Sequence, residues 1–375
     1  APSLFRSQVE EFLASAGTAL ARLARTSDAS VAEVADARAA HLDAVEAVRP
    51  AHELFDLIAA HRAGVGHLPE AIKPDTISKS RTNSLVAETV SNLRPLHLPS
   101  AFPEVFTRPN PGFDCILGNP PWEEATVEEL GFWALRFPGL KSMKPGEQKR
   151  EITRLRSDRA DLVTEYDAEI TSAELVRRTL TAGPYPGMGT GDPDLYKAFC
   201  WRFWHLTRTG GAVGVVLPRS ALSAAGSSPW REAVLDEGCF ADVTLLLNNK
   251  QWVFNEVHPQ YTVGLLSLRK GLDFAGLVSV RGPFSSLAAF DVGVDAKPAE
   301  FPVEEFRTWA EGAAFPLLPS ADAATVFAKL RRHPRLDGRD EREREGERDL
   351  RTTWRARPVT EFHATADKHL FELDR

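Results

Sequence analysis

Three things are scarce in this chain of 375 residues, and each scarcity excludes a class of protein. The three cysteines, Cys115, Cys200 and Cys239, lie far apart without CxxC spacing, which fits a reducing cytoplasm and predicts no structural zinc site. No apolar run is long enough to span a membrane, and no segment resembles a signal peptide. Basic residues are not in excess, since the net charge is −7, so nucleic-acid binding would need a locally basic face.

The apolar residues, 43% of the chain, are enough for a sizeable core, and their pattern predicts an α/β fold. Residues 3–25 and 30–62 are alanine-rich and predict two helices, the second opened by a Ser30–Glu33 capping box. Helical patterns then alternate with apolar strands, which predicts a mainly parallel sheet with an antiparallel pair at its edge. The predicted strands are 113–117, 212–218, 242–247 and 261–268.

The stretch GFDCILGNPPWEE, residues 112–124, ends an apolar strand in a stiff loop. Ligands of open α/β sheets bind beyond the carboxyl ends of strands, which is where this loop lies. Two prolines fix two φ angles and remove two N–H donors, which leaves carbonyl oxygens and the Asn119 side chain as acceptors beside the flat face of Trp122. Such a site suits a planar ring with an amino group, whose lone pair is localised when both amine hydrogens are accepted. The alternative is an ordinary Pro-Pro turn with a surface tryptophan, followed by Glu123 and Glu124 at the start of a helix.

An [Asn/Asp/Ser]-Pro-Pro-aromatic tetrad after a hydrophobic strand resembles the hallmark of amino-group methyltransferases that use S-adenosylmethionine. The chain is similar to adenine-N6 DNA methyltransferases of the gamma class, especially the methylase modules of type IIG restriction–modification enzymes and phage-defence methylases. Three stretches carry this resemblance in order: residues 96–123 (LHLPSAFPEVFTRPNPGFDCILGNPPWE), residues 194–218 (DLYKAFCWRFWHLTRTGGAVGVVLP) and residues 243–268 (VTLLLNNKQWVFNEVHPQYTVGLLSL). The resemblance implies a partial methyltransferase (Rossmann-like) sheet with an N-terminal helical insertion.

The resemblance also assigns roles in base recognition. Asn119 and the carbonyl of Pro120 would accept the N6 hydrogens, and Pro121 completes the rigid tetrad. Trp122 would stack on the flipped base, and Phe254 would pack on its other face or edge. Base flipping is required because an N6 atom inside a duplex cannot reach a buried methyl donor. For Phe254 the alternative is simple core packing.

The expected cofactor site is incomplete in this sequence. Leu195 and Phe199 match apolar positions that line the adenine of S-adenosylmethionine in the family, although their i, i+4 spacing also suits core packing. The family's glycine-rich loop after a first strand is not found, and the glycine-rich stretch 183–193 follows no predicted strand. We therefore expect that the chain begins after that half of the site, and that alone it binds neither cofactor nor DNA well.

These observations divide the chain into three expected parts: a helical insertion (1–85), a methyltransferase catalytic segment (86–275, with an insert at 124–190), and an extension (276–375) leading toward a DNA target-recognition region. Within the extension, the mixed-charge run 331–357 favours a solvated helix or linker over a DNA-binding patch. The expected protein is cytoplasmic, without a membrane or metal partner. The resemblance implies that it acts on double-stranded DNA with a flipped adenine, with restriction or defence-system subunits as possible partners.

Several alternatives remain open from sequence. Cytosine-N4 methylation of DNA uses the same loop chemistry, although Asn119 favours adenine. Methylation of a glutamine side chain or of guanine in ribosomal RNA fits the insert and the trailing region poorly. A non-catalytic DNA-binding or scaffold segment is favoured by the missing cofactor loop.

Overall fold

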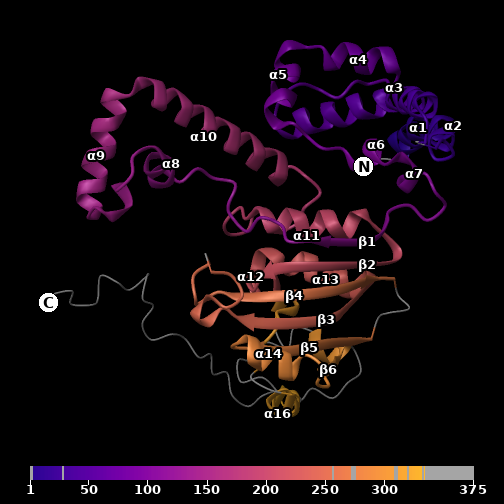
Figure 1. The fold of residues 1–375 in the computed structure, drawn as a ribbon. Helices are drawn as coiled ribbons and strands as arrows, with labels where there is room; N and C mark the ends of the chain where they lie inside the picture. The colour runs from indigo at the N-terminus through magenta and orange to yellow at the C-terminus, as the bar shows by residue number, and fades with distance from the viewer. Residues whose placement is uncertain are drawn as a thin grey trace, which may run out of the picture.

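The structure is a computed structural model, and it describes residues 3–27, 29–255, 257–271, 276–307, 311–318, 321–331 and 333. It is a mixed α/β protein in which helices surround one six-stranded sheet (Figure 1). The stretch 334–375, with most of the mixed-charge run and the expected approach to a DNA-recognition region, lies outside the described residues. None of the described helices combines the length and the apolar composition that a membrane span needs.

The sheet has the order β1-β2-β4-β3-β5-β6. β1 and β2 are parallel, as are β3 and β5, whereas β4 lies antiparallel between β2 and β3, and β6 is antiparallel to β5. All four predicted strands are found, but two predictions are wrong. The sheet is mixed and not mainly parallel, because β4 and β6 run antiparallel to their neighbours. The antiparallel pair does not form an edge, because β5 and β6 continue the same sheet beyond β3. The strands are β1 (Phe113–Gly118), β2 (Thr207–Pro218), β3 (Gly238–Leu247), β4 (Thr262–Lys270), β5 (Leu277–Phe284) and β6 (Ala299–Pro302).

The helices that come before β1 in the sequence form a helical layer. Ser30 caps the long helix α3 as predicted, since its hydroxyl accepts a hydrogen bond from the Glu33 amide (3.2 Å) and donates to the Glu33 carboxylate (2.8 Å). The helix continues through Pro50, and the first predicted helix is divided in two near residue 15. The helices of this layer are α1 (Ser3–Ala14), α2 (Gly17–Leu23), α3 (Val31–Arg62), α4 (Pro74–Arg81), α5 (Ser84–Leu93), α6 (Leu98–Ala101) and α7 (Pro103–Phe106).

The insert at 124–190 forms a helical arm with a small core of its own. Its helices are α8 (Glu129–Arg136), α9 (Pro145–Asp158) and α10 (Ala160–Thr181), and Figure 1 shows them extending away from the sheet before α10 returns toward α3 and α5. The core of the arm is aromatic, with Phe132, Trp133 and Tyr166 in mutual contact. This arm therefore holds its shape without burying residues of the sheet.

One face of the sheet carries the main core and the other is partly open. Helices α11 (Leu195–Leu206), α12 (Ser220–Ser223) and α13 (Ser228–Glu237) pack on the first face around Trp204, Trp230 and Phe240. On the edge strand β1 the side chain of Leu117 is 80% exposed. The remaining helices lie along the β5–β6 side: α14 (Leu287–Gly293), α15 (Val303–Arg307) and α16 (Ala321–Arg331).

Candidate functional site

The Asn-Pro-Pro-Trp loop follows β1 directly, at the carboxyl end of the strand. Asn119 is exposed there, whereas Pro120 is buried. Gly118 makes this path possible, because a Cβ at that position would lie only 3.0 Å from the ring of Phe203 on α11. The glycine thus lets β1 end close to α11.

Backbone hydrogen bonds join the residues after the tetrad to the start of α11. The Ala125 amide donates to the Pro193 carbonyl (3.1 Å), and the Leu195 amide donates to the Glu123 carbonyl (2.9 Å). The expectation that Glu123 begins a helix is wrong, because these bonds hold residues 123–125 extended and α8 begins only at Glu129. The candidate loop is therefore fixed at both ends, by β1 and by α11.

The glycine-rich stretch 183–193 has a packing role. It follows helix α10, which confirms the prediction that no strand precedes it. Gly187 has a φ of +86°, and a Cβ there would lie 2.1 Å from the Gly226 carbonyl oxygen. The buried Lys197 holds the end of the stretch, since its Nζ donates to the Asp192 carbonyl at 2.5 Å and lies 3.3 Å from the Asp194 carboxylate.

The structure brings the two predicted base-contacting aromatics together. The rings of Trp122 and Phe254 meet edge to face, with centroids 5.8 Å apart and planes at 88°. Such a contact is worth about 0.5–1.5 kcal/mol beyond the area it buries. Trp122 also packs against the main core, and within the described part of the chain its buried Nε1 has no hydrogen-bond partner. In this conformation the two rings touch, so a base can enter between them only if they separate.

Asn248, at the end of β3, positions Phe254 and was not predicted. Its side chain is fully buried, and its Oδ1 accepts hydrogen bonds from the amides of Val253 (3.1 Å) and Phe254 (3.0 Å). Its Nδ2 donates to the carbonyls of Phe254 and Val257, both at 3.0 Å. One side chain therefore organises the connection between β3 and β4. The signal available in the sequence is an asparagine directly after a buried strand, a residue type that is equally typical of an ordinary turn.

Two hollows flank β1, and the predicted residues divide between them. Phe199 and Phe203 line a pocket of about 940 Å³ together with β1 and α3. Asn119 lines a hollow of about 500 Å³ on the open face of the sheet, together with Asp242 and Phe290. Leu195 is half-buried and lines neither, although its amide is bonded to Glu123. The structure thus does not place Asn119 and the two predicted cofactor residues in one pocket.

No family model and no curated protein matches this chain. Among solved structures, the chain is similar to a modification subunit of a putative type I restriction enzyme from Vibrio vulnificus YJ016. The two share 15% sequence identity with a TM-score of 0.31, and the match covers 56% of this chain and 37% of the other. The chain therefore spans little more than a third of the length of that subunit. A similarity of this size does not assign a function.

Proposed function

We propose that this chain carries the catalytic loop of a site-specific DNA methyltransferase that methylates adenine N6, in a restriction–modification or phage-defence system. One observation carries the proposal: the tetrad at residues 119–122 follows the carboxyl end of β1, with Asn119 exposed and Trp122 against Phe254. The resemblance of the sequence around these residues to gamma-class methyltransferases supplies the substrate class.

The chemistry of the proposed reaction needs acceptors and not a strong base. The lone pair of an exocyclic amine is conjugated with its ring, so the amine is a poor nucleophile. Asn119 Oδ1 and the Pro120 carbonyl would each accept one N6 hydrogen, which localises the lone pair on the nitrogen. Pro120 and Pro121 lack N–H donors, so the backbone at these two positions offers only carbonyl acceptors. The site then acts by positioning and by hydrogen-bond polarisation.

S-adenosylmethionine would supply the methyl group, and the described residues fit it in part. Phe199 lies on the wall of the 940 Å³ pocket, where an apolar ring can contact an adenine. Among the described residues before β1 there is no strand that leads into a glycine-rich loop, so the contacts for the rest of the cofactor are not found there. We propose that Phe199 and Leu195 provide apolar contacts and that other residues of the intact protein complete the site.

The test is a single-turnover methylation assay with the intact protein on unmethylated DNA, with the modified nucleoside identified by mass spectrometry. We expect N6-methyladenine from the unaltered protein, and a rate about 10²–10³ lower for Asn119→Ala, which removes one positioned acceptor. Asn249→Ala is the matched control, because Asn249 is also an exposed asparagine after a strand but lies outside the tetrad.

Each other result identifies a different function. If the product is N4-methylcytosine, the target base is cytosine and not adenine. If Asn119→Ala and Asn249→Ala methylate at the same rate, Asn119 takes no part in the reaction. DNA binding without any methylation by the intact protein would favour the non-catalytic scaffold segment.

A further inference from the structure

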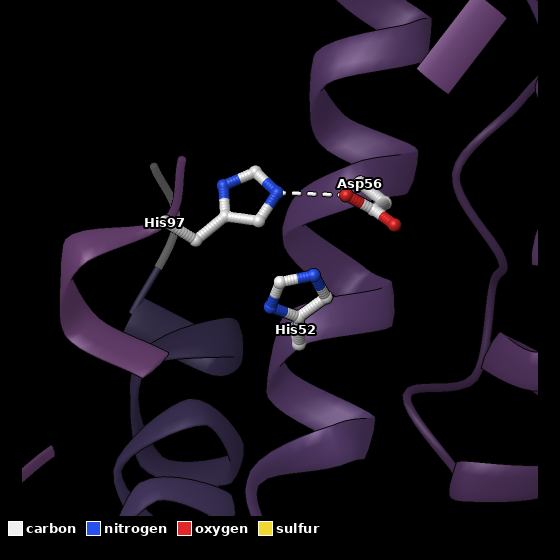
Figure 2. Close-up of side chains that lie close together, drawn as sticks. All are labelled: His52, Asp56 and His97. Carbon is white, nitrogen blue, oxygen red and sulfur yellow. Dashed lines mark hydrogen bonds and ion pairs between the residues drawn. The ribbon is translucent and has the colours of Figure 1, made fainter. Parts of the chain in front are cut away.

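Two histidines and an aspartate that are not part of the tetrad meet in the helical layer. His52 and Asp56 lie one turn apart on α3, and His97 lies directly before α6. One ligand atom of each residue lies within 4.8 Å of those of the other two. Figure 2 shows the His52 ring beside the hydrogen-bonded pair formed by His97 and Asp56. The i, i+4 spacing puts His52 and Asp56 on one face of α3, and the chain returns to that face at His97.

The Asp56 carboxylate is held in one orientation. It is only 4% exposed, and its Oδ2 accepts a hydrogen bond of 2.7 Å from Arg81 Nε. Its Oδ1 lies 2.8 Å from His97 Nε2. Because a carboxylate only accepts, that nitrogen carries the hydrogen of the bond. Arg81 thus fixes one oxygen and leaves the other directed at the imidazoles, as outer partners do for carboxylates that bind metals.

A serine fixes the tautomer of His52. The Ser100 hydroxyl donates its hydrogen to the His97 carbonyl (3.0 Å) and lies 3.2 Å from His52 Nδ1. A hydroxyl has one hydrogen, so Ser100 accepts from Nδ1–H and leaves the lone pair on His52 Nε2.

We propose that His52, Asp56 and His97 bind a divalent transition-metal ion such as Zn²⁺. Two imidazole nitrogens and one carboxylate oxygen form a ligand set that zinc uses where a fourth position stays open to water. Binding through Nε2 needs the neutral His97 tautomer with its hydrogen on Nδ1, so the Nε2 hydrogen is given up to solvent, Nδ1 carries a hydrogen from solvent, and the ion takes the place of the Nε2 hydrogen between His97 and Asp56. Two ligand atoms that each lie about 2.0–2.1 Å from a zinc ion are at most about 4.2 Å apart. The exposed His52 ring would therefore move slightly toward the other two ligands when the ion binds.

The charge and the position of the cluster are compatible with a cation. Arg81 adds positive charge near His52, and the carboxylates of Asp56 and Glu53 oppose it. The segment that contains His97 leads toward β1, and the carbonyl of its neighbour Leu96 accepts a hydrogen bond of 3.0 Å from Arg202 on α11. A bound ion would therefore tie α3 to the segment that precedes the candidate loop.

The test is a zinc titration of the full chain by calorimetry and by competition with a chromogenic chelator. All proteins carry Cys115→Ser, because Cys115 is an exposed thiol and thiolates bind zinc. We expect saturation at one zinc per chain, an affinity at least about 100-fold lower for His52→Ala, and one about 10–100-fold lower for Ser100→Ala, which loses an outer-shell partner. His41→Ala, at an exposed histidine of the same helix, should bind as the unaltered chain does.

The His52→Ala variant also allows a loss of zinc binding to be distinguished from a loss of folding. It leaves both hydrogen bonds of Asp56 intact, so its melting temperature without zinc should match that of the unaltered chain. Added zinc should raise the melting temperature of the unaltered chain and not that of His52→Ala. The proposal is overturned if the unaltered chain shows no saturable binding, if His52→Ala binds equally well, or if His41→Ala loses binding to the same extent.

Discussion

Replacing Asn248 by alanine should loosen the connection between β3 and β4 and with it the Trp122–Phe254 contact. The substitution deletes four hydrogen bonds that link one buried side chain to two amides and two carbonyls. Each such bond contributes about 0.5–1.5 kcal/mol net, which gives about 2–6 kcal/mol for four. Because the connection is half-exposed, water can reach some of the released groups, so we expect a loss of about 2–4 kcal/mol in the free energy of unfolding.

The chain supplies its own control at the next position. Asn249 is exposed, so Asn249→Ala should change the free energy of unfolding by less than about 0.5 kcal/mol. Equilibrium urea unfolding followed by tryptophan fluorescence suits the comparison, because Trp252 lies in the connection and donates a hydrogen bond to the Leu247 carbonyl (2.6 Å). Equal unfolding free energies for the two variants would refute the role that we assign to Asn248.

Further predictions concern the same loops and the cofactor. Lys250 has a φ of 56°, so Lys250→Gly should stabilise the chain by about 0.5–1 kcal/mol in urea unfolding. Gly187→Ala should destabilise it by more than about 1 kcal/mol, because the new Cβ meets the Gly226 carbonyl, whereas Gly189→Ala, where a Cβ finds only a methyl group at 3.9 Å, should be nearly neutral. Phe254→Ala should weaken binding of the flipped base by about 1–3 kcal/mol, and by less on DNA with a mismatched target adenine. If the variant protein instead has a lower melting temperature and loses the same fraction of its methylation rate on matched and mismatched duplexes, Phe254 is a core residue. Calorimetric titration of this chain with S-adenosylmethionine should show no saturable binding, and a micromolar dissociation constant would contradict that expectation.

The parts of the fold that sequence predicted are those with a strong local pattern. The strand 212–218 is a continuous apolar run closed by proline, and α3 begins at the predicted N-cap, where Ser30 Oγ accepts from the Glu33 amide. The strands β5 and β6 carry no such pattern. The first contains a Gly-Pro pair, the second is four residues long, and both are specified by pairing with the rest of the sheet.

The candidate site divides in the same way. The tetrad was recognisable because its chemistry lies in four consecutive residues. The contact between Trp122 and Phe254 followed only from the resemblance, since the two residues are 132 residues apart in the chain. Asp56 and His97 are likewise 41 residues apart, and nothing local to either indicates the other. Sequence periodicity reports which face of an element is buried, but not which distant side chain it meets.

β1 is an edge strand of the sheet, and this affects how easily the strand and the candidate loop after it detach. In the described sheet β1 pairs with β2 alone, whereas β4 is paired on both sides. Fewer backbone bonds must therefore break for β1 to detach, and its amides should exchange their hydrogens with solvent sooner than those of β4. Asn119 is therefore attached to a strand that should open more readily than β4. Any segment that paired with the free edge of β1 would slow that opening, and it would hold the candidate catalytic side chain in place without touching it.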